Sequence, residues 1–181
     1  MTAESFVAEL AVCRPSIEDY RAIGASESGA AQMHRRYQAT RKDVPAFSQD
    51  PMEEILRLLQ GWDVSTVEVG LVGFAADVSF TPDLGWIVGA VEIDPLVLRE
   101  DNGEIDLRDF YQPSHVMSDV ARNGSSFLDA LIHAAQYFSD CVKRRVDSRD
   151  VEVARRVAEE CAVQAGGPQY LRFYRSLCGG D

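Results

Sequence analysis

The chain has 181 residues, of which 46% are hydrophobic and 26% are charged, and its formal net charge is −11. This length suffices for one domain with a hydrophobic core, and the composition excludes wholesale disorder. No apolar run approaches the roughly 20 residues that span a bilayer, and the start MTAESFVAEL lacks the basic leader of a secretory signal. We therefore expect a cytoplasmic protein without membrane segments.

The N-terminal region reads as helical over residues 4–42. Ser16 with Asp19 predicts a capped helix over Ile17–Ile23 that stops at Gly24. A second, polar helix is expected over 27–42, since basic residues gather at its end. After a loop over 43–49, the pattern predicts a helix over 50–61. Asp50 would be its N-cap, with Pro51 in the first turn and Gly61 as its terminator.

The middle of the chain predicts strands. Residues 64–78 are rich in β-branched and small residues, and Trp86–Asp94 is nearly continuously apolar, as expected of one covered strand. Two further strands, 96–98 and 105–110, flank an Asn-Gly pair at 102–103, which predicts a tight hairpin. In the returning strand, alternation places Ile105 and Leu107 on an apolar face and Asp106 on a wet, carboxylate-rich face.

The remaining segments predict helices again. Ser126 stands three residues before Asp129, as in a capping box. An apolar stripe at helical spacing follows, made of Phe127, Leu131, Ala134, Ala135, Phe138 and Val142. A further helix after Ser148 and a short aromatic tail would cover the remaining sheet surface or form a dimer seam.

These elements predict an α+β fold, a mostly antiparallel sheet with helices from both termini packed on one face. We expect a single domain over 1–181. Its core would lie at about 50–145, with N-terminal helices over 4–42 and a C-terminal helical extension over 147–178.

One segment resembles a known family. The residues are Asp94-Pro95-Leu96-Val97-Leu98, the turn ending in Gly103-Glu104-Ile105, the acidic Asp109, and the run from Ser125 to Leu131 (SSFLDAL). This order of strand, acid-Gly turn, strand, loop and Ser-Phe helix resembles the C-terminal half of the SUKH superfamily, which includes bacterial immunity proteins of polymorphic-toxin systems. The resemblance covers roughly residues 70–140 and implies a non-enzymatic protein-binding domain. The region before it lacks the family's usual entry helix.

The negative charge is concentrated in the same segment. Residues 61–140 hold 14 acidic and 3 basic residues, a net charge of −11, whereas the rest of the chain balances to zero. Such a surface repels nucleic acid and attracts a basic protein. We predict a partner-binding surface made of Glu92, Asp94, Glu100, Asp101, Glu104, Asp106 and Asp109. The alternative is that these carboxylates only keep the domain soluble.

Reactive motifs are sparse. His34, His115 and His133 are scattered, and four distant cysteines show no paired spacing, which favours reduced thiols over a zinc site. His115 and Asp119 form an i, i+4 pair that would face together on a short helical turn. One such pair is too little for a site, and because the histidines and cysteines are scattered we expect no metal and no cofactor.

Three functions follow in order of preference. The first is an immunity protein that neutralises a basic toxin domain, such as a nuclease, by covering its active surface. The second is an intracellular adaptor of the same fold with a cellular protein partner. The third is a small hydrolase that uses His115. A homodimer is an open alternative.

Overall fold

The computed structural model describes residues 1–43 and 53–179. Its helices, in chain order, are α1 (Ala3–Cys13), α2 (Ile17–Ala22), α3 (Glu27–Arg35), α4 (Glu54–Gly61), α5 (Gly124–Val142), α6 (Val151–Ala165), the 3-10 helix η1 (Pro168–Tyr170) and α7 (Leu171–Cys178). A two-stranded sheet pairs β1 (Thr40–Arg41) with β2 (Trp62–Asp63).

The main sheet has six antiparallel strands in sequence order, so each strand pairs with the next one along the chain. The strands are β3 (Glu68–Val69), β4 (Val72–Thr81), β5 (Gly85–Val91), β6 (Asp94–Leu98), β7 (Ile105–Arg108) and β8 (Val116–Ala121). In such a meander, alternate turns lie at opposite ends of the sheet.

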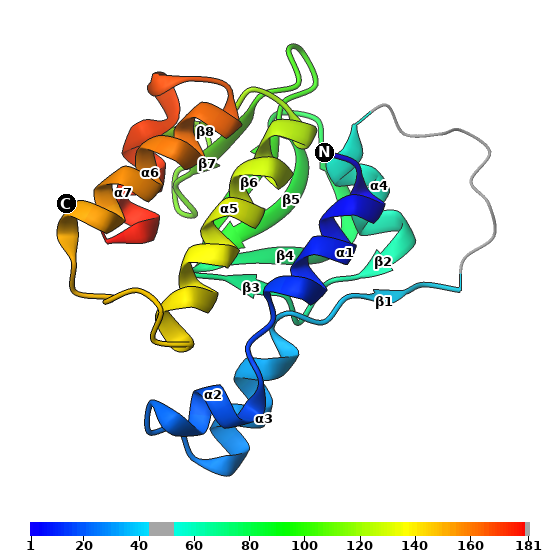
Figure 1. Cartoon of the computed structure of the whole chain (residues 1–181). Helices are drawn as coiled ribbons and strands as arrows, with labels where there is room; N and C mark the ends of the chain where they lie inside the picture. The colour runs from blue at the N-terminus through cyan, green and yellow to red at the C-terminus, as the bar shows by residue number, and fades with distance from the viewer. Residues whose placement is uncertain (44–52, 180–181) are drawn as a thin grey trace.

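The helices cover one face of this sheet. Figure 1 shows α1, α4 and α5 lying across it, with α6 and α7 beside α5 at the β7–β8 side, while α2 and α3 extend away from the body. On the other face, Gly73, Ala75, Ile87 and Gly89 line an open hollow of about 470 Å³. The predicted α+β fold, with its antiparallel sheet and helices from both ends, is confirmed.

A single contiguous core runs from Ala3 to Cys178. The α5 stripe supplies Phe127, Leu131 and Ala134, all buried against the sheet. The C-terminal helices belong to this core as well, since Tyr174 of α7 is fully buried. They therefore complete the domain that the preceding segments form.

The helices in the N-terminal region agree only in part with those predicted from the sequence. The capping box of α2 is confirmed, since Asp19 donates its N–H to Ser16 Oγ (3.1 Å) and accepts the N–H of Ser16 (2.8 Å). The helix expected over 27–42 is wrong beyond Arg35, because residues 40–41 pair with β2. The fourth helix ends at Gly61 as predicted, but it begins at Glu54 after the extended N-cap residue Glu53, so the predicted start at Asp50 is wrong. Asp50 and Pro51 themselves lie outside the described residues.

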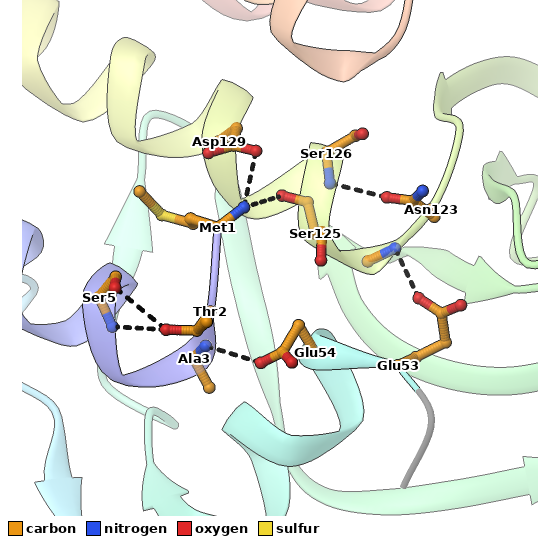
Figure 2. A network of polar contacts seen from close by, with 11 residues as sticks. Met1, Thr2, Ala3, Ser5, Glu53, Glu54, Asn123, Ser125, Ser126 and Asp129 are labelled. Atoms are coloured by element: carbon orange, nitrogen blue, oxygen red, sulfur yellow. Dashed lines mark hydrogen bonds and ion pairs between the residues drawn. The ribbon is translucent and has the colours of Figure 1, made fainter.

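The start of α5 differs from the expected capping box. Asn123 is the N-cap, and its Oδ1 accepts the N–H of Ser126 at 2.8 Å. Glu53, which precedes α4, accepts the N–H of Gly124 at 3.0 Å (Figure 2). Two oxygens therefore satisfy the first free N–H groups of α5, and the capping role predicted for Ser126 is wrong.

Asp129 has another partner in the same place. Its Oδ2 lies 2.7 Å from the ammonium group of Met1, which also donates to the carbonyl of Ser125 at 3.2 Å (Figure 2). Beside it, Glu54 of α4 accepts the N–H of Ala3 at 2.9 Å. The N-termini of α1, α4 and α5 thus meet at one point. We call this contact the helix junction.

We expect Asn123→Ala to lower the free energy of unfolding by about 1 kcal/mol, because it removes the N-cap acceptor. Ser126→Ala is the matched control, since the Ser126 hydroxyl makes no hydrogen bond within residues 1–43 and 53–179. Urea unfolding of the two variants measures both changes. Equal losses, or a larger loss for Ser126→Ala, would contradict the assignment.

A second prediction concerns two glycines on the neighbouring strands β4 and β5, Gly73 opposite Ala90 and Gly89 opposite Phe74. A Cβ at Gly89 would lie 2.3 Å from the carbonyl oxygen of Gly73, whereas a Cβ at Gly73 meets nothing within 4 Å. Gly89→Ala should therefore destabilise the fold by about 1–3 kcal/mol through overpacking. Gly73→Ala should be tolerated. Thermal and urea unfolding of the two variants measure both changes. If Gly89→Ala were tolerated as well as Gly73→Ala, the carbonyl of Gly73 would not limit the side chain at position 89.

Candidate functional site

Exposed apolar side chains gather at one end of the sheet. The β3–β4 turn, the β5–β6 turn and the β7–β8 loop all lie at this end, as the meander requires. We call it the loop-end surface and define it by Leu71, Glu92, Ile93, Asp94, Asp109, Phe110, Tyr111, Val116 and Met117. Ile93 is 56% exposed, Phe110 55% and Tyr111 81%. A cluster of exposed apolar side chains with polar residues at its rim is typical of a protein interaction site.

The β5–β6 turn was not expected from the sequence. The single strand predicted over Trp86–Asp94 is wrong, because β5 ends at Val91 and pairs there with Asp94, leaving Glu92 and Ile93 as a two-residue turn. Glu92 has a φ of 55°, a left-handed conformation that glycine usually provides. This turn directs Ile93 into solvent.

Two predicted partner-binding residues organise the β7–β8 loop. Asp94 Oδ1 accepts the N–H of Phe110 at 3.0 Å, which ties the loop to the β5–β6 turn. Asp109 Oδ1 accepts the N–H groups of Tyr111 (2.7 Å) and Gln112 (2.9 Å). Phe110 and Tyr111 then meet edge to face, with ring centroids 5.3 Å apart. The aromatic pair is thus held by the backbone contacts of two carboxylates.

The opposite end of the sheet holds three other predicted residues. Glu100, Asp101 and Glu104 lie in the β6–β7 turn, about 15 Å from the loop-end surface, given the length of the five-residue strand β6. Asp101 binds Arg99 through both carboxylate oxygens (3.0 and 2.6 Å), and this hydrogen bonding lowers the pKa of Asp101. The predicted single acidic surface is therefore two separate groups.

The hairpin between β6 and β7 is confirmed, but the conformation of its turn differs from the predicted one. Leu98 pairs with Ile105, so six residues connect the strands, and the N–H of Gly103 bonds the carbonyl of Arg99 at 3.0 Å. Gly103 has a φ of 75°, whereas Asn102 does not adopt a positive φ. The tight Asn-Gly turn predicted from the sequence is wrong, because Asn102 instead bonds Glu104 through its side chain.

Asp106 is buried, and its predicted place on an exposed face is wrong. Only 1% of the residue is exposed. Its Oδ2 accepts a hydrogen bond from Arg108 at 3.0 Å, whereas its Oδ1 has no partner among the described residues. Burial raises the pKa of Asp106 and Arg108 opposes that rise. Alternation assigned the correct strand face, but Val97 and Arg108 cover the carboxylate there.

His115 and Asp119 do not lie side by side, as the hydrolase alternative would require. Val116–Ala121 is strand β8, so His115 and Asp119 are about 13 Å apart along extended backbone. The helical turn that would bring them together is therefore wrong.

Within residues 1–43 and 53–179, no three His, Cys, Asp or Glu side chains gather in a way that could hold a metal ion. In the part of the chain that the structure describes, no helix has the length and apolar character to cross a membrane.

A small apolar pocket lies beside the loop-end surface, between the sheet and α7. Its volume is about 160 Å³, and it is lined by Leu71, Val91, Leu107, Met117, Ser118, Arg172, Phe173, Ser176 and Leu177. Four of these residues come from the meander and four from α7, with Leu71 from the β3–β4 turn. We call it the α7 pocket.

The sequence did not reveal the apolar part of this site. Ile93 looked like the interior of a strand, and Leu71 stood within the predicted strand segment 64–78. Met117 lay in the loop after the strand 105–110, where the sequence predicted only a short helical turn. Phe110 and Tyr111 next to the Asp109 turn were the available signal, since two adjacent aromatic residues in a polar loop seldom serve a core.

Comparison of the chain with protein-family models, with curated proteins and with solved structures finds no match. The resemblance to the SUKH superfamily therefore stays a prediction based on the residues named above.

The Asp106–Arg108 pair gives a pH-dependent prediction. We expect Arg108→Leu to raise the pKa of Asp106 further, because it removes the group that opposes the effect of burial. A buried carboxylate with a raised pKa favours folding when protonated, and this contribution is lost as the pH rises through that pKa. Arg108→Leu should then cost about 3 kcal/mol near pH 7 and much less near pH 3.

The measurement combines urea unfolding at both pH values with an NMR titration of the Asp106 carboxyl carbon. Arg155→Leu is the control, because Arg155 pairs with the exposed Glu152 on α6 and does not act on Asp106. A loss of stability independent of pH in Arg108→Leu would show that packing, rather than the ion pair, dominates.

Proposed function

We propose that this chain is a non-enzymatic protein-binding module whose binding surface is the loop-end surface. The observation that supports this most is the group of exposed side chains Ile93, Phe110 and Tyr111 on backbone fixed by Asp94 and Asp109. Aromatic residues dominate the energetics of protein interfaces, and a fixed backbone lowers the entropy lost on binding.

The electrostatics indicate a basic partner. Glu92 is exposed beside the apolar patch, and Asp94 and Asp109 retain an exposed fraction while holding the loop. An apolar centre with a charged rim is the usual arrangement of a specific interface. Carboxylates at the rim would steer a basic protein toward the surface and raise its association rate at low salt.

We propose further that the partner is a basic toxin domain, such as a nuclease, and that the chain acts as its immunity protein. The support is the acidic character of residues 61–140 together with the resemblance of that segment to SUKH immunity proteins. Binding would cover the active surface of the toxin, so neutralisation would require no chemistry from this chain.

The test co-expresses the chain with the product of the adjacent gene in its source organism and measures growth and complex formation. We expect the chain to restore growth and the double variant Ile93→Asp, Phe110→Asp to fail, with a loss of affinity of at least about 100-fold, since hot-spot truncations reach several kcal/mol. Val12→Asp and Val163→Asp, at two exposed valines outside the site, form the control pair.

Charge reversal tests the steering separately. Glu92→Lys should lower the association rate and flatten its salt dependence, with a smaller effect on dissociation. Binding without any effect on growth would favour the adaptor alternative over an immunity protein. Unchanged affinity in the Ile93→Asp, Phe110→Asp variant would remove the loop-end surface as the binding site.

A further inference from the structure

The α7 pocket lies where the loop-end surface meets the C-terminal helix. Leu71 and Met117 belong to both, so the pocket is continuous with the exposed apolar patch. Leu71 is 52% exposed and Met117 36%, so they form its open side, while Phe173 of α7 forms a buried wall.

We propose that the α7 pocket receives a single aliphatic or aromatic side chain of the partner, flanked on the partner's chain by lysine or arginine. This inference rests on the proposed function, because it names what the partner inserts at the loop-end surface.

The size of the pocket sets the class of occupant. Its volume is about 160 Å³. Cavities of about 150 Å³ with aliphatic and aromatic walls hold a benzene ring, whereas drug-sized ligands and cofactors occupy roughly 300–1,000 Å³. One phenylalanine or leucine side chain therefore matches the space, and a nucleotide does not.

The walls require an apolar occupant. Val91, Leu107 and Leu177 have aliphatic side chains, and Met117 adds a flexible thioether that adapts to different shapes. The polar lining groups are Ser118, Ser176 and Arg172. Ser176 and Arg172 can donate hydrogen bonds to backbone carbonyls that accompany an inserted side chain, whereas the Ser118 hydroxyl already donates to the carbonyl of Asp119.

The surroundings of the pocket favour basic neighbours in the partner. Glu92 follows the lining residue Val91, Asp119 follows Ser118, and both side chains are exposed. Arg172 is the opposing charge, and it forms no ion pair with any residue in 1–43 or 53–179. Since residues 61–140 carry a net charge of −11, the balance around the opening is negative.

The geometry of β8 indicates side-chain insertion rather than strand addition. β8 is an edge strand, but its pairing with β7 shifts register twice, between Ile105 and Asp106 and again between Leu107 and Arg108. Bulges of this kind interrupt the regular edge that an added strand needs, and they redirect side chains. Met117, within the second irregularity, lines the pocket.

The test uses synthetic pentapeptides with blocked ends and the ¹⁵N-labelled full chain. Lys-Lys-Phe-Lys-Lys is the probe, Lys-Lys-Ser-Lys-Lys lacks the anchor, and Glu-Glu-Phe-Glu-Glu reverses the charge. Amide shifts detect weak binding, so each peptide is titrated to millimolar concentration. We expect the phenylalanine probe to shift the amides of Met117, Ser118 and Leu177 and to bind at least about tenfold more tightly than either control peptide.

The matched protein variants are Ser176→Phe and Val163→Phe. Both residues are exposed on helices, and only Ser176 lines the pocket. Ser176→Phe should fill the pocket and weaken the probe at least about tenfold, whereas Val163→Phe should leave it unchanged. Leu71→Ser, which removes an exposed part of the wall, should weaken the probe as well.

Equal affinity for the phenylalanine and serine peptides, or equal affinity of the two variants for the probe, would overturn the inference. The growth assay distinguishes this outcome from failure of the proposed function. If the Ser176→Phe variant restores growth normally while the double variant Ile93→Asp, Phe110→Asp does not, the loop-end surface binds the partner without the pocket. If neither variant changes protection, the proposed function itself fails.

Discussion

The helix junction is the contact on which the rest of the structure depends. Helix N-termini carry free N–H groups and partial positive charge, so three of them cannot meet without compensating acceptors. Glu53 supplies an acceptor to α5 and Glu54 supplies one to α1, whereas Asp129 binds the ammonium group of Met1, across sequence separations of 51 to 128 residues. Glu53 also approaches the β6–β7 turn, since a Cβ at Gly103 would lie 3.3 Å from its Oε1. The junction therefore closes one end of the molecule and leaves the loop-end surface at the opposite end of the sheet.

This arrangement explains why the carboxylates at the two ends of the sheet have different structural roles. Near the junction, carboxylates are bound by backbone N–H groups, by the ammonium group of Met1, or by Arg99 within its turn. At the loop end, Asp94 and Asp109 also accept backbone N–H groups, but there they hold exposed aromatic residues in place. A net charge of −11 thus conceals two structural uses of carboxylates. Only Glu92 among the loop-end acids makes no such contact within the described chain.

The sequence predicted the features that local chemistry decides. The Ser16–Asp19 capping box, the end at Gly61 and the α5 stripe depend on neighbouring residues, and they are confirmed. The errors arise where distant contacts decide. Asn123 and Ser126 both match an N-cap pattern, and the approach of Glu53 from another helix is invisible in the sequence. The turn at Glu92–Ile93 carries no glycine, proline or asparagine, so hydrophobicity alone extended the strand through it.

The loop end carries features that work against stability. A left-handed backbone at a residue other than glycine costs about 1–3 kcal/mol, and Glu92 adopts it where glycine would be unstrained. Ile93 and Tyr111 keep more than half of their surface exposed, so they gain little hydrophobic stabilisation from folding. Selection for stability alone would replace these residues, because polar side chains and glycine satisfy the same backbone better. Their presence at the loop end supports the proposal that this surface binds a partner.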